Sequence, residues 1–187
     1  MEQFELTKSL VNIPSVTGQE GACTEFVRSQ LQARGYRVDL QPVSEGRLNV
    51  VAFHGTPEVI LSTHLDTVPP FVPADEDEAF IYGRGSCDAK GILASQILAA
   101  ERLRDEGVRD FGLLFLVGEE TTSDGAQIAN AVPPGSKYII NGEPTENKLV
   151  IGSKGNLRLE GCSGAGGNRR LRFRGSQGLG SDLVKTT

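Results

Sequence analysis

The stretch Val59-Ile60-Leu61-Ser62-Thr63-His64-Leu65-Asp66 ends an apolar strand on a histidine and a carboxylate two residues apart. Side chains two residues apart on a strand point to the same face of a sheet. A neutral imidazole can bind a metal through one nitrogen while a carboxylate holds its other N–H. The pattern therefore predicts that His64 is a metal ligand and that Asp66 orients it. A surface histidine beside a loop acid is the alternative.

A further candidate, Asp88, follows the glycine-bearing segment Gly83-Arg84-Gly85-Ser86 at the start of a long helix predicted for residues 87–106. Ser86 is the expected N-cap of this helix, because a serine hydroxyl accepts hydrogen bonds from the free N–H groups there. An acid near a helix N-terminus is often stabilised by the helix dipole alone. The glycine-bearing approach favours a second interpretation, in which Asp88 reaches a buried site and bridges two cations.

Three glutamates follow two other apolar segments. Glu119-Glu120 comes after the run 111–117, which is typical of a central strand covered on both faces. Adjacent acids repel unless cations or protons intervene, so we expect one to bind metal while its neighbour accepts a proton from water. Glu143 follows a short strand at 137–140, and Pro144 restricts the turn. Solvated surface turns are the alternative for these glutamates.

Strand-like and helix-like segments alternate along the chain, which predicts an α/β fold with helices on both faces of a sheet. The expected strands are 36–40, 49–53, 58–63, 111–117 and 137–140, and the main expected helices are 4–13, 20–34, 87–106 and 126–132. The turn 54–57 predicts a hairpin between two of the strands, so the sheet should be mixed and largely parallel. Ligands bind beyond the carboxyl ends of the strands in such sheets, where His64 and the acids are expected.

The composition argues against several classes of protein. A net charge of −5 gives no indication of nucleic-acid or membrane binding, and no apolar run approaches the roughly 18 residues of a membrane span. The N-terminus, Met1-Glu2-Gln3-Phe4-Glu5, lacks the layout of a signal peptide. Three widely spaced cysteines favour reduced thiols over a disulfide framework. We therefore expect a cytoplasmic protein that binds neither nucleic acid nor a membrane.

Four segments together resemble one known family. They are Ser62-Thr63-His64-Leu65-Asp66-Thr67-Val68-Pro69, Gly83-Arg84-Gly85-Ser86-Cys87-Asp88-Ala89-Lys90-Gly91, Gly118-Glu119-Glu120 and Asn141-Gly142-Glu143-Pro144-Thr145. In this order and spacing they resemble the M20 family of metallopeptidases, over about residues 1 to 161. Within the family, the chain looks like the branch of acetylornithine deacetylase and succinyl-diaminopimelate desuccinylase.

The resemblance implies a zinc-peptidase-like catalytic domain with two zinc ions, with cobalt as a further candidate metal. Carried over by position, the metal ligands would be His64 and Glu143 on one ion, Asp88 between both ions, and Glu120 on the second. Glu119 would be the general base, and Asp66 would orient the histidine. The implied reaction cleaves the amide of an N-acyl amino acid or small peptide with a metal-activated water.

Two features depart from the family pattern. The family's lid domain and its later histidine ligand have no counterpart, since no histidine follows His64. We therefore expect residues 1–161 to be the N-terminal part of the catalytic domain. Residues 162–187 are rich in glycine and arginine, and we expect a poorly ordered or frame-shifted tail. A sheet edge left uncovered in this way would favour a homo-oligomer.

Three interpretations of function remain open on these grounds. The first is a metal-dependent amidohydrolase. The second is a catalytically inactive, truncated fragment that folds and binds one metal ion or none. The third is an α/β domain whose acids all lie in solvated turns. The resemblance implies that the family's lid domain supplies a histidine that stabilises the oxyanion. Removing a single oxyanion donor costs about 2.7–4 kcal/mol of transition-state stabilisation, so we expect this chain by itself to be weakly active or inactive.

Overall fold

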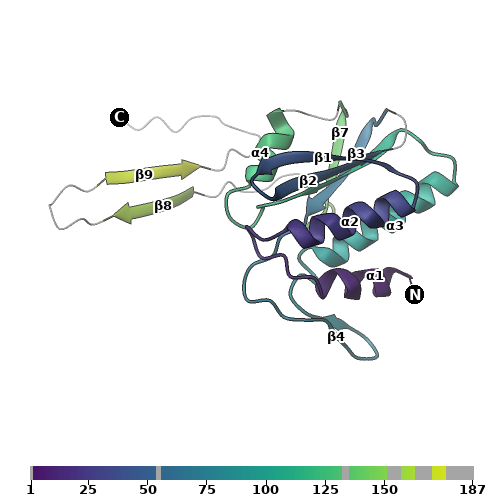
Figure 1. The fold of residues 1–187 in the computed structure, drawn as a ribbon, viewed down its shortest axis with the longest axis horizontal. Coiled ribbons are helices and arrows are strands. Elements are labelled where there is room, and N and C mark those ends of the chain that lie inside the picture. Colours follow the sequence, from purple (N-terminus) through teal and green to yellow (C-terminus); the bar gives the residue numbers. More distant parts are fainter. Residues whose placement is uncertain (1, 54–55, 132–134, 151–156, 163–169, 176–187) are drawn as a thin grey trace. The chain divides into compact units, whose positions relative to one another are not determined.

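The structure is a computed structural model that describes residues 2–53, 56–131, 135–150, 157–162 and 170–175. The chain divides into two compact units between residues 146 and 147. The first unit holds the central sheet and all described helices (Figure 1). None of the described helices is long and apolar enough to cross a membrane.

The central sheet has five strands in the order β1-β2-β6-β3-β7. These strands are β1 (Arg37–Ser44), β2 (Arg47–Phe53), β3 (Val59–His64), β6 (Phe111–Leu116) and β7 (Tyr138–Asn141). β3 pairs in parallel with both β6 and β7, whereas β2 pairs antiparallel with β1 and β6. Only β2 therefore opposes the other strands, and the predicted α/β fold with a mixed, largely parallel sheet is confirmed.

Helices cover both faces of this sheet. The helices α1 (Glu2–Val11), α2 (Gly21–Ala33) and α3 (Lys90–Asp105) lie along one side of it (Figure 1). The short helix α4 (Asp124–Ala131) packs on the other side, where Ala129 joins Val51 and Leu114 in a small cluster. Successive strand residues alternate between the faces, so neighbours of Val51 and Leu114 along β2 and β6 join the larger core.

β6 is the buried centre of the sheet. Leu113 and Phe115 are fully buried in the larger core, and Leu114 is buried on the opposite face. Full burial of one such side chain stabilises the fold by about 1.5–3 kcal/mol. A place in the middle of the sheet, where both faces are covered, is therefore favoured for this strand. The apolar run therefore predicted the strand and its central place correctly.

The predicted hairpin between β2 and β3 is wrong. β6 lies between these two strands and pairs with both, although it comes later in the chain. A strand that is apolar on both faces needs a covered place within the sheet, and the interval between β2 and β3 provides it. Two residues of the connecting turn, His54 and Gly55, lie outside the described residues.

The segment before α3 also differs from the prediction. The helix begins at Lys90, and residues 84–89 form a turn, so Asp88 precedes the helix. The Ser86 hydroxyl donates to the carbonyl of Gly83 at 3.0 Å and does not cap the helix. The Lys90 N–H instead donates to the carbonyl of Gly85 at 2.8 Å. A carbonyl of the turn therefore accepts the first N–H of the helix. The Asp88 side chain is not used as a cap and remains available to the site.

Two small ladders complete the described structure. β4 (Asp75–Glu76) and β5 (Ile81–Tyr82) pair antiparallel within the first unit. In the second unit, β8 (Leu157–Cys162) pairs antiparallel with β9 (Arg170–Gly175). β9 falls within the glycine- and arginine-rich tail, for which no regular element was predicted, and most of that tail lies outside the described residues. The predicted boundary at residue 161 stays a prediction.

The edge strand β7 presents apolar side chains to solvent. Tyr138, Ile139 and Ile140 are 62%, 60% and 57% exposed. Their ladder partner is β3, and β7 ends the order of the described sheet. An exposed apolar edge is a template for pairing with another chain. Self-association through this edge stays a prediction.

Candidate metal centre

The carboxyl ends of β6, β3 and β7 meet at one edge of the sheet, because these neighbouring strands are parallel. His64 is the last residue of β3. Glu119 and Glu120 lie three and four residues after the end of β6, and Glu143 lies two residues after the end of β7. Asp88 approaches from the turn before α3. The topology thus gathers the predicted residues at the edge where ligands of such sheets usually bind.

Three of the four predicted ligands lie close together. Nε2 of His64 is 2.8 Å from Oδ1 of Asp88 and 3.9 Å from Oε2 of Glu143. One ligand atom from each residue lies within 4.8 Å of the others, so these three side chains could hold a metal ion together. The imidazole is 1% exposed, and the two carboxylates are partly open to solvent at 50% and 35%. The group therefore combines a buried nitrogen donor with two accessible oxygen donors.

Glu120, the fourth predicted ligand, is not a member of this compact group. The pKa of Glu120 is raised by burial first and by the charge of Asp88 second. Glu120 therefore lies close enough to Asp88 for their charges to interact. The geometry thus brings His64, Asp88 and Glu143 together and leaves Glu120 at the border of the site.

The Glu143 turn is fastened to β3. The Gly142 N–H donates to the Ser62 carbonyl at 2.7 Å, and the Thr63 hydroxyl donates to the Gly142 carbonyl at 2.8 Å. Within the turn, the Asn141 amide donates to Oε1 of Glu143 at 3.1 Å. Oε1 is therefore occupied, and Oε2 is the oxygen that faces His64.

Asp66 links the histidine to the Glu119-Glu120 turn. Nδ1 of His64 lies 2.9 Å from the backbone carbonyl of Asp66 and 3.5 Å from its carboxylate Oδ1. The carboxylate accepts the backbone N–H of Glu119 at 3.0 Å and that of Glu120 at 3.1 Å. The residue predicted to orient the imidazole thus makes its shortest contact with the ring through its backbone, while its carboxylate holds the turn.

Thr17 is a member of the site that sequence reasoning missed. Its hydroxyl donates to Oδ2 of Asp66 at 2.7 Å. Backbone hydrogen bonds between the two segments, Thr17 N–H to Thr67 carbonyl and Thr67 N–H to Ser15 carbonyl, place the threonine there. The threonine precedes Asp66 by 49 residues in a polar turn, where no local pattern marks it.

His64 and the acids of the site shift one another's pKa. Burial lowers the pKa of His64, but hydrogen bonds to Asp66 and Asp88 and the charge of Glu143 outweigh it and raise this pKa to about 10. Burial, followed by the charges of neighbouring acids, raises the pKa of Glu119 and Glu143, although His64 acts in the opposite direction. Carboxylates held together in this way are stabilised by a divalent cation, often the largest local charge in such a site.

Asp66 behaves in the opposite manner. Burial raises the pKa of its carboxyl, but hydrogen bonds from His64, Thr17 and the backbone N–H groups of Glu120 and Glu119 together hold this pKa below the usual value. Asp66 is therefore ionised at neutral pH and serves as a fixed anion beneath the site. One imidazole and several carboxylates form a donor set that suits zinc.

Comparison with known proteins identifies the family. The sequence model of peptidase family M20/M25/M40 matches residues 60–164, more than half of the 187-residue chain. The chain belongs to peptidase family M20/M25/M40. It is a hydrolase by family, and the predicted M20 membership is confirmed at this level.

Curated relatives and solved structures agree with this assignment. An M20 domain-containing protein of Schizosaccharomyces pombe is 44% identical over 167 residues, covering 84% of this chain and 42% of the relative. A probable carboxypeptidase of Neosartorya fischeri is 40% identical over 186 residues, covering 82% and 42%. The chain thus spans less than half the length of these two relatives.

The M20 fold extends to more distant structures. The di-peptidase Dug1p of Saccharomyces cerevisiae matches with a TM-score of 0.64 at 18% identity, covering 85% of this chain and 41% of that one. Human carnosine dipeptidase 1 matches with a TM-score of 0.62 at 20% identity, covering 86% and 41%. A dinuclear metal-binding M20 peptidase of Bacillus subtilis matches with a TM-score of 0.57 at 18% identity, covering 74% and 41%.

Proposed function

We propose that the protein carrying this chain is a metal-dependent amidohydrolase. The observation that carries this proposal is the convergence of His64, Asp88 and Glu143 within 4.8 Å at the carboxyl edge of the sheet. The substrate class we propose is an amide whose nitrogen belongs to an amino acid with a free carboxylate. Both a short peptide and an N-acyl amino acid meet this description.

Two considerations support this substrate class. Relatives that are 38–40% identical to this chain carry the name probable carboxypeptidase, which describes cleavage at the carboxyl end of a peptide. The sequence motifs resemble acetylornithine deacetylase and succinyl-diaminopimelate desuccinylase, whose substrates present the same kind of amide with a smaller acyl group. The chemical difference between these substrates lies on the acyl side of the bond.

We further propose that two zinc ions bind here, with cobalt as an alternative metal. His64 and Glu143 would hold one ion, Asp88 would lie between both, and Glu120 would bind the second. When bound, such a pair of ions activates water and polarises the amide carbonyl.

The protein's own residues would handle the proton. Glu119 is the proposed general base, which takes a proton from the attacking water and returns it to the leaving amine. Its pKa is raised by burial first and then by Glu143, Asp66 and Asp88, and a base works best with a pKa near the working pH. Its backbone N–H is bonded to Asp66, so the residue that fixes the imidazole also fixes the base.

The second candidate is a folded metal-binding domain without turnover. It is favoured by the single histidine in the ligand group of the described residues. Under this candidate one metal ion binds, and no amide is cleaved by this chain alone.

Metal analysis combined with hydrolysis assays tests both candidates. In the protein that carries this chain, we expect zinc to survive dialysis, and we expect hydrolysis of peptides with a free C-terminal carboxylate, N-acetylornithine or N-succinyl-diaminopimelate. A C-terminally amidated peptide is the matched control and should resist. The variant Glu119→Gln should keep its zinc and lose about 10²–10⁴-fold in rate. Metal without turnover would support the second candidate, and absence of tight metal binding would exclude both.

A further inference from the structure

The turn that joins β6 to α4 carries Glu119 and Glu120, and it is closed upon itself. The Ser123 N–H donates to the Gly118 carbonyl at 2.7 Å, and the Gly125 N–H donates to the Val117 carbonyl at 3.2 Å. Asp66 holds one side of this turn through the N–H groups of Glu119 and Glu120. A second set of contacts reaches it from β2.

Asn49 on β2 joins the two ends of the turn. Its Oδ1 accepts the Val117 N–H at 3.1 Å, and its Nδ2 donates to the Gly125 carbonyl at 2.9 Å. The side chain is fully buried. A Cβ atom on Gly125 would collide with both Val117 and Asn49, so the close approach depends on glycine. The Asn49 side chain thus bonds to the backbone just beyond β6, where the hydrogen bonds between strands have ended.

Arg47, two residues earlier on β2, fastens the turn where α4 begins. Its Nη1 donates to Oδ2 of Asp124 at 2.5 Å, and its Nη2 donates to Oδ1 at 3.2 Å. The same guanidinium donates through Nε and Nη2 to both carboxylate oxygens of Glu20, at 3.0 and 2.8 Å. A planar guanidinium matches two carboxylates in this way, which a lysine ammonium cannot do.

Glu20 keeps Arg47 in place from the opposite side. Its side chain is fully buried just before α2, and that of Arg47 is 14% exposed. Hydrogen bonds to Glu20 and Asp124 raise the pKa of Arg47 further above its usual value, although burial opposes this. Breaking a buried pair of this kind leaves an uncompensated charge, so the position of the guanidinium is strongly determined.

We infer that Arg47 and Asn49 are positioning residues for the Glu119-Glu120 turn. Residues two apart on a strand share a face, and these two support the turn from β2 while Asp66 supports it from the site. None of their contacts given above involves His64, Asp88 or Glu143. The inference rests on the proposed function, in which Glu119 is the base and Glu120 a ligand. Arg47 acts on both only through the backbone of the turn.

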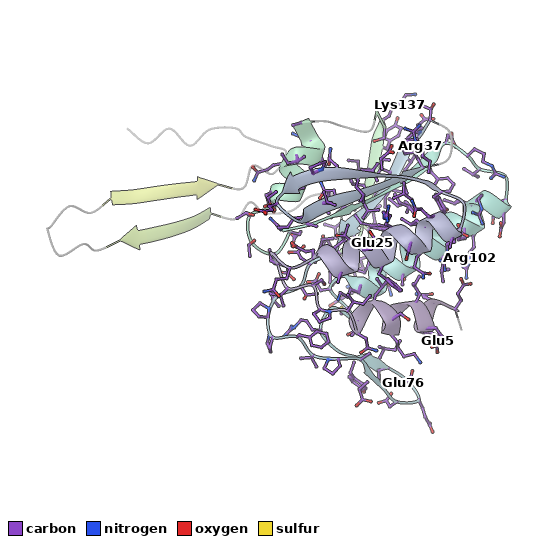
Figure 2. The ribbon with its side chains drawn as sticks, viewed as in Figure 1. Glu5, Glu25, Arg37, Glu76, Arg102 and Lys137 are labelled. Atoms are coloured by element: carbon purple, nitrogen blue, oxygen red, sulfur yellow. The ribbon has the colours of Figure 1, made fainter. Side chains whose placement is uncertain are left out.

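Three variants test the inference. Arg47→Met removes the guanidinium, and Arg47→Lys keeps the charge without its planar geometry. Arg28→Met is the matched control, because Arg28 also donates through Nε and Nη2 to both oxygens of a glutamate, Glu25, at 2.9 and 2.7 Å. That pair is exposed on α2, where Figure 2 labels Glu25.

The primary measurement is amide hydrogen exchange by NMR. In Arg47→Met we expect protection of the Glu119 and Glu120 amides to fall by about tenfold or more, while the amides of β3 keep their protection. Arg47→Lys should lie between this variant and the parent, and Arg28→Met should match the parent. Unchanged protection at Glu119 and Glu120, or an equal loss across β3 and the turn, would overturn the inference. If Arg47→Met does not fold, the same comparison is made with Arg47→Lys. Unchanged protection of the turn, or an equal loss across β3 and the turn, would then overturn the inference.

Kinetics and cobalt spectra add measurements that would not change if Arg47 only stabilised the fold. We expect Arg47→Met to lower kcat by up to about 100-fold, the effect of a small misplacement, with KM unchanged. Loading with Co²⁺ should give an altered visible spectrum in Arg47→Met and the parent spectrum in Arg28→Met. A parent protein that neither binds metal nor turns over would refute the proposed function, and the exchange data would still decide the positioning role.

Discussion

Nε2 of His64 lies 2.8 Å from Oδ1 of Asp88, although 24 residues and two secondary-structure elements separate them. The same nitrogen faces Oε2 of Glu143 at 3.9 Å, and the opposite ring nitrogen is held by the Asp66 carbonyl at 2.9 Å. One edge of the imidazole is thus committed to the protein, and the other faces two carboxylates. A ligand histidine is usually oriented by such a bond to its second nitrogen.

Asp88→Asn should weaken metal binding more than any change outside the ligand group. An amide has no charge to offer two cations, so we expect the zinc affinity to fall by more than the roughly 10- to 100-fold typical of outer-shell changes. Competition titration with a chromophoric chelator measures this. Glu25→Gln, an exposed acid on α2, is the control and should bind like the parent. Equal affinities for Asp88→Asn and parent would remove Asp88 from the metal site.

The local parts of this site could be predicted from sequence. His64 ends one apolar strand with Asp66 two residues beyond it, and Glu119-Glu120 follows another strand. A parallel sheet brings these residues to one edge. The partners that fix their geometry could not be predicted in this way. Thr17 reaches Asp66 across 49 residues, and Arg47 reaches Asp124 across 77. These contacts depend on the tertiary fold and leave no periodic signal in the chain.

Strand order and helix start show the same limit. The turn after β2 predicted a hairpin from local composition, whereas the burial of β6 on both faces decided the pairing. Ser86 has the residue type of an N-cap, yet its hydroxyl bonds to Gly83 and the helix begins later. Propensity describes the choices open to a short segment, and packing selects among them.

Asp66→Asn should destabilise the metal-free protein at neutral pH. The carboxylate is fully buried and accepts two backbone N–H groups and the Thr17 hydroxyl. An asparagine cannot accept all of these bonds, and each buried group left unsatisfied costs about 1–3 kcal/mol. The free energy of unfolding in urea with a chelator present measures the loss. Unfolding energies equal to the parent at pH 7 would contradict it.

The pH dependence of this effect has a definite sign. The pKa of Asp66 is lowered in the folded protein. The ionised carboxylate therefore contributes its full stabilisation of the fold at a pH above the pKa of the unfolded chain, about 3.9. This stabilisation disappears as the pH falls through the lower pKa of the folded protein. The gap between parent and Asp66→Asn should therefore narrow in acid. Asp77→Asn is a matched control, since Asp77 also accepts two backbone N–H groups and a hydroxyl, but in an exposed loop. Its effect should be smaller.

Glu119→Gln should stabilise the metal-free protein at pH 7. The pKa of Glu119 is raised by burial first and by nearby acids, so its ionisation opposes folding as the pH rises from the unfolded value toward the raised one. Removing an unfavourable functional charge commonly gains about 0.5–2 kcal/mol. The low end applies here because the Glu119 side chain is only partly buried, and the solvent that reaches it screens its charge. Thermal unfolding with a chelator measures the gain.

Zinc should cancel this gain, because bound cations favour the ionised glutamate. Glu78→Gln changes an exposed acid in the loop between β4 and β5 and should unfold like the parent. A Glu119→Gln variant no more stable than the parent without metal would show that its carboxylate is not strained by the site.

Gly118→Ala and Gly107→Ala separate backbone strain from steric collision at the turn. Both glycines have positive φ, +75° and +87°, a conformation that costs an alanine about 1–2 kcal/mol. A Cβ atom on Gly107 would meet nothing within 4 Å, whereas one on Gly118 would collide with Asp124 and Arg47. The free energy of unfolding of Gly118→Ala should therefore fall by about 1–3 kcal/mol more than that of Gly107→Ala, the usual penalty of overpacking. It should also lower the zinc affinity, because the displaced turn carries Glu120. Urea unfolding and zinc titration of both variants measure these differences, and equal losses would show that the contact between Gly118 and the Arg47–Asp124 pair is unimportant.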